Sequence, residues 1–191
     1  VGNWYGIAFY DESNDASVMR RCMVRYSGHG SAGGVTMIDA SPTIDECDFS
    51  QNYFGAYFQN ASNPTFTNNT IGSSSMTPIA MSFEANPTFT NNVLSFSDNQ
   101  YDAIGLIGGT LTADAHIIQR DFTTVSNITY LMLAGITVPS AYTLTIDPGI
   151  VIKSTTYSYR IIIEGKLLAD GTADDWITFT SVKDDNYGNP G

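Results

Sequence analysis

Residues that could do acid–base or metal chemistry are few and scattered in this sequence of 191 residues. The segment SGHGS at Ser27–Ser31 sets His29 between two glycines, and histidine is the side chain best suited to proton transfer near neutral pH. Two carboxylate pairs, Asp174–Asp175 and Asp184–Asp185, could give oxygen ligands to a hard cation such as calcium. Neither pair has further carboxylates at a fixed spacing, and solvated turn residues explain both equally simply. The sequence therefore predicts no catalytic residue, and calcium is the only cofactor it suggests.

A repeat places one set of small or amide side chains at equivalent positions. The heptapeptide NPTFTNN occurs at 63–69 and again 23 residues later at 86–92, and the related SPTIDEC begins 22 residues before the first copy. Periods of this size are typical of solenoid proteins, in which equivalent coils stack on one another. Alignment of the copies on their apolar residues gives one shared inward position, which we call the ladder: Cys22, Cys47, Asn69 and Asn92.

The ladder residues have a physical role in such a stack. An inward asparagine at a bend can donate and accept hydrogen bonds for backbone groups that the bend leaves unpaired. Cysteine is small and apolar enough to occupy the same position. Cys22 and Cys47 should then lie in neighbouring coils, close enough for a disulfide. Side chains stacked in parallel have poor torsional geometry for that bond, so we favour two buried thiols.

The segments that must position the ladder are short strands. Helical periodicity is not sustained anywhere, whereas apolar runs bounded by Gly, Ser, Asn or Pro recur between the ladder residues. These runs are Gly6–Phe9, Gly34–Ile38, Gly55–Phe58, Pro78–Phe83 and Ala103–Ile107. The pattern predicts an all-β fold, a single-stranded parallel β-helix (β-solenoid) of about eight coils, with 22–25 residues per coil in the N-terminal half.

We expect one β-helix domain over 1–191 with three parts. Residues 1–118 form the Asn/Cys-ladder coils, 119–135 form an irregular connection, and 136–191 form regular coils. In the last part, apolar strands alternate with turn sequences such as DPG, EGK, ADGT and DDNYG. Glycine, aspartate and asparagine favour turns because they tolerate or locally bond the required backbone conformations.

Composition restricts the possible partners and points to a location. Eight basic against nineteen acidic residues give a formal net charge of −11, which opposes sequence-independent binding to nucleic acid or an anionic membrane. No stretch approaches the roughly 20 apolar residues of a membrane span. Richness in Thr, Ser, Asn, Gly and Tyr suggests an extracellular or cell-surface protein, and the valine start suggests a processed or excised chain. Candidate N-glycosylation sites are Asn60, Asn68 and Asn127.

The chain resembles the right-handed parallel β-helix repeat proteins of microbial surfaces, within the pectin-lyase-like class. The resemblance covers almost the whole chain and is carried by LTIDPGIVIK at 144–153, by IIIEGKLLADGTADDWITFTS at 161–181, and by the W-x-G-I strand at Trp4, Gly6 and Ile7. In the family that strand follows the other two segments, whereas here it stands at the opposite end of the chain. The C-terminal coil thus reads on into the N-terminal coil.

This rotated order, together with the absence of polar end caps in the sequence, implies head-to-tail stacking of the chain on itself. The contact would join the N-terminal coil at Trp4–Phe9 to the C-terminal coil at Ile177–Gly188. The resemblance then implies a non-enzymatic structural protein: a filament subunit or a slice of a long repetitive surface protein.

A carbohydrate-active protein is the alternative. Polygalacturonases share the β-helix fold and have a GHG motif, to which His29 would correspond, but their clustered aspartates and Arg-x-Lys motif are missing in that order. Pectate lyases hold calcium with several acidic residues and use an arginine base. Eleven tyrosines could stack on sugars. A glycan-binding adhesin and a relative of polysaccharide lyases or hydrolases therefore both stay open.

Overall fold

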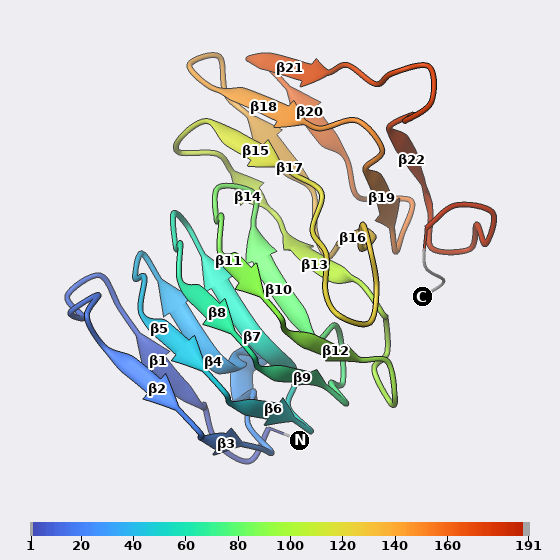
Figure 1. The fold of residues 1–191 in the computed structure, drawn as a ribbon. Coiled ribbons are helices and arrows are strands. Elements are labelled where there is room, and N and C mark those ends of the chain that lie inside the picture. The colour runs from blue at the N-terminus through green and yellow to red at the C-terminus, as the bar shows by residue number, and fades with distance from the viewer. Residues whose placement is uncertain (1, 189–191) are drawn as a thin grey trace.

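The computed structural model describes residues 2–188, which form one parallel β-solenoid (Figure 1). A long sheet of eight parallel strands runs from one end to the other, and its neighbouring strands are 21 to 28 residues apart in the chain. The eight strands make seven successive pairings, so they enclose about seven complete turns. The predicted all-β parallel solenoid is confirmed. The strands are β1 (Ile7–Phe9), β4 (Gly33–Ile38), β7 (Phe54–Gln59), β10 (Ile79–Ser82), β13 (Ile104–Ile107), β16 (Tyr130–Met132), β19 (Val151–Ser154) and β22 (Thr178–Ser181).

Two lateral sheets close the first half of the solenoid. One contains β2 (Val18–Arg20), β5 (Thr43–Asp45), β8 (Thr65–Thr67) and β11 (Thr88–Thr90), and the other contains β3 (Met23–Val24), β6 (Asp48–Ser50), β9 (Thr70–Gly72) and β12 (Val93–Ser95). A two-residue turn joins the two strands within each coil. Alternation along the strands turns Phe66 and its equivalents inward and the flanking threonines outward, as expected for sheets with one buried face.

Two different lateral sheets close the second half. They consist of β14 (Gly109–Thr110), β17 (Ile136–Val138) and β20 (Ile161–Ile163), and of β15 (Ala115–Ile117), β18 (Thr143–Ile146) and β21 (Lys166–Ala169). The arrangement of these sheets differs from the expected internal division in two places. The ladder sheets end with β12 rather than near 118, and the expected irregular connection 119–135 contains β16, whose three apolar side chains are buried between β13 and β19.

An internal cap ends the first pair of lateral sheets. Along β2, β5 and β8, the carbonyl before each strand accepts the first N–H of the next strand in the sheet, as Pro64 O accepts from Thr88 N at 2.9 Å. Among the strands of residues 2–188, none follows β11 in this sheet. The Arg120 side chain supplies the missing donors instead: Nη1 donates to Pro87 O at 2.7 Å and Nη2 to Asn86 Oδ1 at 2.8 Å. The Arg120 side chain thus takes the place of the backbone donors that a further coil would provide.

Two threonines complete the cap on the second ladder sheet. Thr123 N donates to Asn92 O at 2.9 Å, as Val93 N does to Asn69 O one coil earlier. Thr124 Oγ1 lies 2.9 Å from Leu94 O and 3.2 Å from Leu94 N, so it pairs the outer edge of β12. Phe122 closes the core below them, with its ring 5.0 Å from that of Phe89.

The core is one continuous apolar column inside the coils. Phe49, Phe66 and Phe89 occupy successive coils with ring centroids 6.1 and 6.0 Å apart, within the range of favourable aromatic packing. Across residues 2–188 the one helical element is a short 3-10 turn at His29–Ser31. Over the same residues, no helix has the length and apolar character needed to span a membrane.

Candidate functional site

The turn that carries each ladder residue begins in a left-handed backbone conformation. Arg21, Glu46, Asn68 and Asn91 have φ values of 52–57°. This conformation is uncommon outside glycine and is most accessible to asparagine and aspartate. It reverses the chain so sharply that the next residue, the ladder residue, points into the core.

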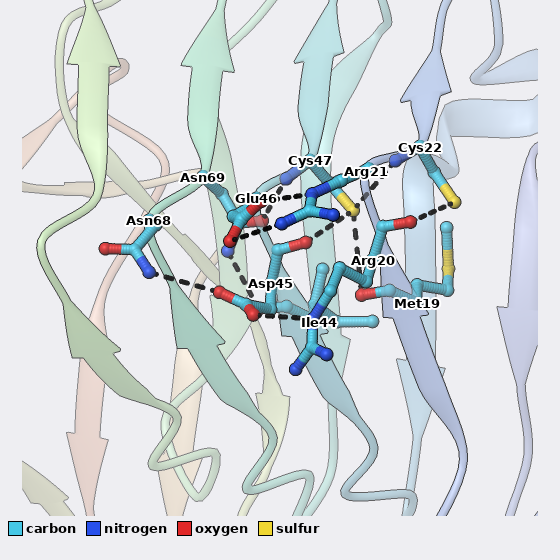
Figure 2. Close-up of polar contacts among 10 residues, drawn as sticks. All are labelled: Met19, Arg20, Arg21, Cys22, Ile44, Asp45, Glu46, Cys47, Asn68 and Asn69. Atoms are coloured by element: carbon cyan, nitrogen blue, oxygen red, sulfur yellow. Dashed lines mark hydrogen bonds and ion pairs between the residues drawn. The ribbon is translucent and has the colours of Figure 1, made fainter.

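Asparagine in the ladder satisfies the backbone of the coil before it. Asn69 Oδ1 accepts a hydrogen bond from Cys47 N at 2.8 Å, and Asn69 Nδ2 donates to Ile44 O at 3.0 Å (Figure 2). Asn92 makes the same two bonds one coil later, to Asn69 N at 2.9 Å and to Phe66 O at 2.8 Å. Each asparagine therefore joins two coils through a buried donor and a buried acceptor.

Cys47 occupies the same position with weaker bonds. Its Sγ accepts from Cys22 N at 3.4 Å, and it lies 3.7 Å from Met19 O and 3.3 Å from Asp45 O, either of which can accept the thiol proton (Figure 2). Burial raises the pKa of the Cys47 thiol, which favours the neutral, unreactive form. Both cysteines are free thiols. Cys47 is buried as expected, whereas Cys22 is only half-buried because it belongs to the first coil.

A second ladder lies at the next corner, where sequence reasoning did not predict one. Asn52 Oδ1 accepts from Ser27 N at 3.0 Å and Asn52 Nδ2 donates to Val24 O at 2.8 Å, which repeats the pattern of Asn69. Asn99 Oδ1 accepts from Ser74 N at 2.8 Å. Ser27, Asn52 and Ser74 each follow a ladder residue by five positions, and this constant offset is the signal that could have revealed them.

The position of His29 is set by the turn that contains it, and no catalytic side chain lies in contact with its ring in the described residues. A Cβ on Gly28, which has φ 102°, would lie 2.2 Å from Tyr53 Cβ, so glycine is required there by the chain path. The His29 ring makes an edge contact with the Tyr5 ring at 4.7 Å. Within residues 2–188 its imidazole has no hydrogen bond or ion pair. The imidazole that does pair is His116, whose Nε2 lies 2.6 Å from Asp147 Oδ1 on an exposed surface.

The carboxylates suggested as cation ligands lie at two separate places. Asp184 Oδ2 accepts from Thr180 Oγ1 at 2.7 Å and Oδ1 accepts from Asn186, and the Thr180 bond lowers the pKa of the Asp184 carboxyl. Both of its oxygens are thus already engaged. In the described part of the chain, no three His, Cys, Asp or Glu side chains cluster as a metal site would need. Calcium binding remains a prediction.

Asp174 and Asp175 line a groove on the outer side of the last coils. The groove has a volume of about 560 Å³, and Val151 and Thr178 form part of its wall. Trp176 and Tyr187, exposed by 75% and 55%, also line it. Flat aromatic rings next to hydrogen-bond acceptors can bind the apolar face and the hydroxyls of a sugar ring.

The last coil leaves the end of the core column open. Its core-facing side chains Ile163, Leu167 and Phe179 are 38%, 39% and 51% exposed. Their partners one coil earlier, Val138, Leu144 and Ile152, are 0%, 0% and 2% exposed. Strands β20, β21 and β22 each pair on one side only within the described residues. Of these three residues, only Phe179 belongs to the segment Ile177–Gly188 that was expected to stack, whereas Ile163 and Leu167 come from the two strands before it.

The three candidate glycosylation sites differ in accessibility. Asn68 and its sequon partner Thr70 are both exposed. Asn60 is exposed, but its sequon serine, Ser62, is buried. Asn127 is half-buried, and its Nδ2 donates to Gly149 O at 2.8 Å. Asn68 is the site that an enzyme could reach most easily.

The coil geometry, the parallel registers and the inward amide ladder define a parallel β-helix protein. Residues 2–130 match the family described as right handed beta helix region. The chain belongs to this family, which confirms the resemblance to right-handed parallel β-helix proteins. Comparison with curated proteins and with solved structures finds no significant match.

Proposed function

We propose that the protein is a non-enzymatic structural β-solenoid that stacks head to tail on copies of itself. The observation that carries this proposal is the open last coil, where three core-facing side chains that should be buried are one-third to one-half exposed. Covering them removes apolar surface from water, and pairing the free strand edges satisfies their backbone groups. A further coil is the natural occupant of this surface.

The occupant we propose is the first coil of a second copy. Strands β1, β2 and β3 at the other end of the solenoid also pair on one side only among the described residues, so their opposite edges can accept strands. All strand pairs of the long sheet are parallel, and β1 placed on β22 would continue that sheet in the same direction. Because the two surfaces differ, the contact repeats without closing and produces a filament.

We further propose that this filament, or an equivalent slice of a long repetitive surface protein, is extracellular or on the cell surface. The acidic, lysine-poor composition and the accessible sequon at Asn68 support this location. The isolated position of His29 supports a role without catalysis. We also propose that Asn68 is glycosylated, and an increase in the mass of the protein purified from its source would test this.

Electron microscopy and sedimentation of the purified chain test the stacking. Each copy adds eight strands to the long sheet, and a spacing of about 4.8 Å per strand gives an axial repeat of about 38 Å. Leu167→Arg should abolish fibres because Leu167 faces the core end. Leu168→Arg is the matched control, since Leu168 is 42% exposed but faces outward. A chain that stays monomeric at high concentration, or equal effects of both substitutions, refutes the proposal.

Carbohydrate binding is a second candidate function, favoured by the groove beside Trp176. Its two exposed aromatic side chains and two carboxylates suit a hydroxyl-rich glycan. Trp176→Ala should weaken binding to immobilised polysaccharide at least about tenfold, while Tyr157→Ala, which changes a 99% exposed ring away from this groove, should not. Release of reducing ends or unsaturated sugars from the same polysaccharide would instead indicate a hydrolase or a lyase. Equal binding by both variants removes the groove as the site.

A further inference from the structure

The chain leaves the solenoid path after β22. Residues Val182–Gly188, which we call the strap, turn away from β20 and β21 and lie to the side of the long sheet (Figure 1). A Cβ on Gly188 would lie 2.3 Å from Thr129 Oγ1 and 3.1 Å from Val151 Cγ1, so the end of the strap lies against the outer face of β19 and beside the residue that precedes β16. It does not cover the open end of the core.

Specific hydrogen bonds hold the strap in this place. Lys153, an outward residue of β19, is 1% exposed, and its Nζ donates to Asp184 O at 2.8 Å. Thr180 Oγ1 donates to Asp184 Oδ2 at 2.7 Å, and Asn186 N donates to Asp184 Oδ1 at 3.0 Å. Val182 N donates to Ser154 O at 3.0 Å. The strap is therefore a docked segment with its own set of contacts.

With the strap docked, one layer of lateral strands is missing above β20 and β21. The last lateral strands, β20 and β21, belong to the coil that starts with β19, whereas the long sheet continues for one more strand, β22. A second copy that places its β1 on β22 would hold its β2 and β3 two layers above β20 and β21. A gap one strand thick, about 4.8 Å, would remain on both lateral faces.

The opposite end of the chain already follows the solenoid path. Gly2 N donates to Ser27 O at 3.2 Å and Asn3 N donates to Tyr26 O at 3.0 Å, so the residues before β1 lie under the last corner of the first coil. In a stack, these residues of the second copy would therefore occupy the last part of the missing layer. The segment that follows β22 in sequence is the one that must supply its beginning, and in this structure that segment is the strap.

We propose that the strap is a latch on assembly: docked, it leaves the lateral gap empty, and released, it fills the gap between two stacked copies. The inference rests on the proposed head-to-tail stacking and names the step that controls it. Release uncovers the Lys153 side chain and breaks the bonds to Asp184, while filling the gap covers Ile163 and Leu167. The docked conformation of the strap is therefore the one expected in a single copy. The extended conformation is the one expected between two stacked copies.

Thr180→Val tests the latch because it removes the donor to Asp184 and keeps the shape of the side chain. Thr178→Val is the matched control on the same strand, since the Thr178 hydroxyl makes no hydrogen bond in the described structure. Thr180→Val should raise the rate of trypsin cleavage after Lys183, inside the strap, and the rate of fibre growth by about three- to tenfold each. Thr178→Val should leave both rates near those of the unmodified chain.

The outcomes separate the latch from the stacking. Fibres that grow at the same rate in all three proteins, although Thr180→Val accelerates cleavage, overturn the latch and leave the stacking in place. Fibres that form while the strap stays protected from trypsin also overturn it. A chain that forms no fibres, with or without the substitution, overturns both.

Discussion

Replacing Asn69 with leucine should destabilise the solenoid by about 2–6 kcal/mol. The substitution keeps a side chain of similar size in a fully buried position but removes one acceptor and one donor. The N–H of Cys47 and the C=O of Ile44 would then be buried without partners, at a cost of roughly 1–3 kcal/mol each. Urea unfolding followed by circular dichroism measures the difference in the free energy of unfolding.

Two further variants isolate the hydrogen bonds from the packing. Asn69→Cys should cost less than Asn69→Leu, because Cys47 shows that a thiol can pair the same two kinds of backbone group at longer distance. Asn68→Gly is the control on the same turn: Asn68 is exposed with φ 57°, which glycine adopts readily, so the change should stay within about 1 kcal/mol. A loss below about 0.5 kcal/mol for Asn69→Leu, or equal losses for Leu and Cys, would refute the reasoning.

Three other substitutions test the rest of the structure. Burial raises the pKa of Tyr130 from 10 to about 12, so its contribution to stability should be complete below pH 10 and fall by up to roughly 3 kcal/mol as the pH rises through 12. Tyr130→Phe should flatten this alkaline loss in urea unfolding. Arg120→Met removes both donors of the internal cap and should cost about 2–4 kcal/mol in the same assay, and a neutral result would contradict the capping role. The Thr180 hydroxyl lowers the pKa of Asp184, so docking of the strap should persist above the usual value of 3.8 and weaken only as the pH falls through the lower value of the folded protein; in a carbon NMR titration, Thr180→Val should move the midpoint of the Asp184 carboxyl upward.

The first half of the fold was predictable because its coils repeat. NPTFTNN fixed the period, and the inward position of Asn69 followed from the apolar residues on either side. The long-sheet strands were visible as apolar runs between turn residues, and all five runs named from the sequence correspond to strands, from β1 to β13. Local patterns sufficed here because each coil meets an almost identical neighbour.

The remaining features depend on contacts between unlike segments. Arg120 is an unremarkable basic residue in sequence, and its role follows only from the absence of a strand above β11. The strap contains the same turn residues as other loops, but the place where it docks is set by Lys153, some thirty positions earlier in the chain. The groove beside Trp176 likewise joins residues from four coils, from Asn127 to Tyr187. No periodic signal encodes such contacts.

The change of lateral sheets between β12 and β14 has a mechanical consequence. Among residues 2–188, the long sheet is the one sheet that continues past this level, because the internal cap ends the ladder sheets and new lateral sheets start beside it. Above and below this level the solenoid has three sheets along its axis, whereas one sheet crosses the level itself. The solenoid should therefore bend most easily there. Side views in single-particle electron microscopy should therefore show bending at this level, toward or away from the long sheet, while the segments on either side stay straight.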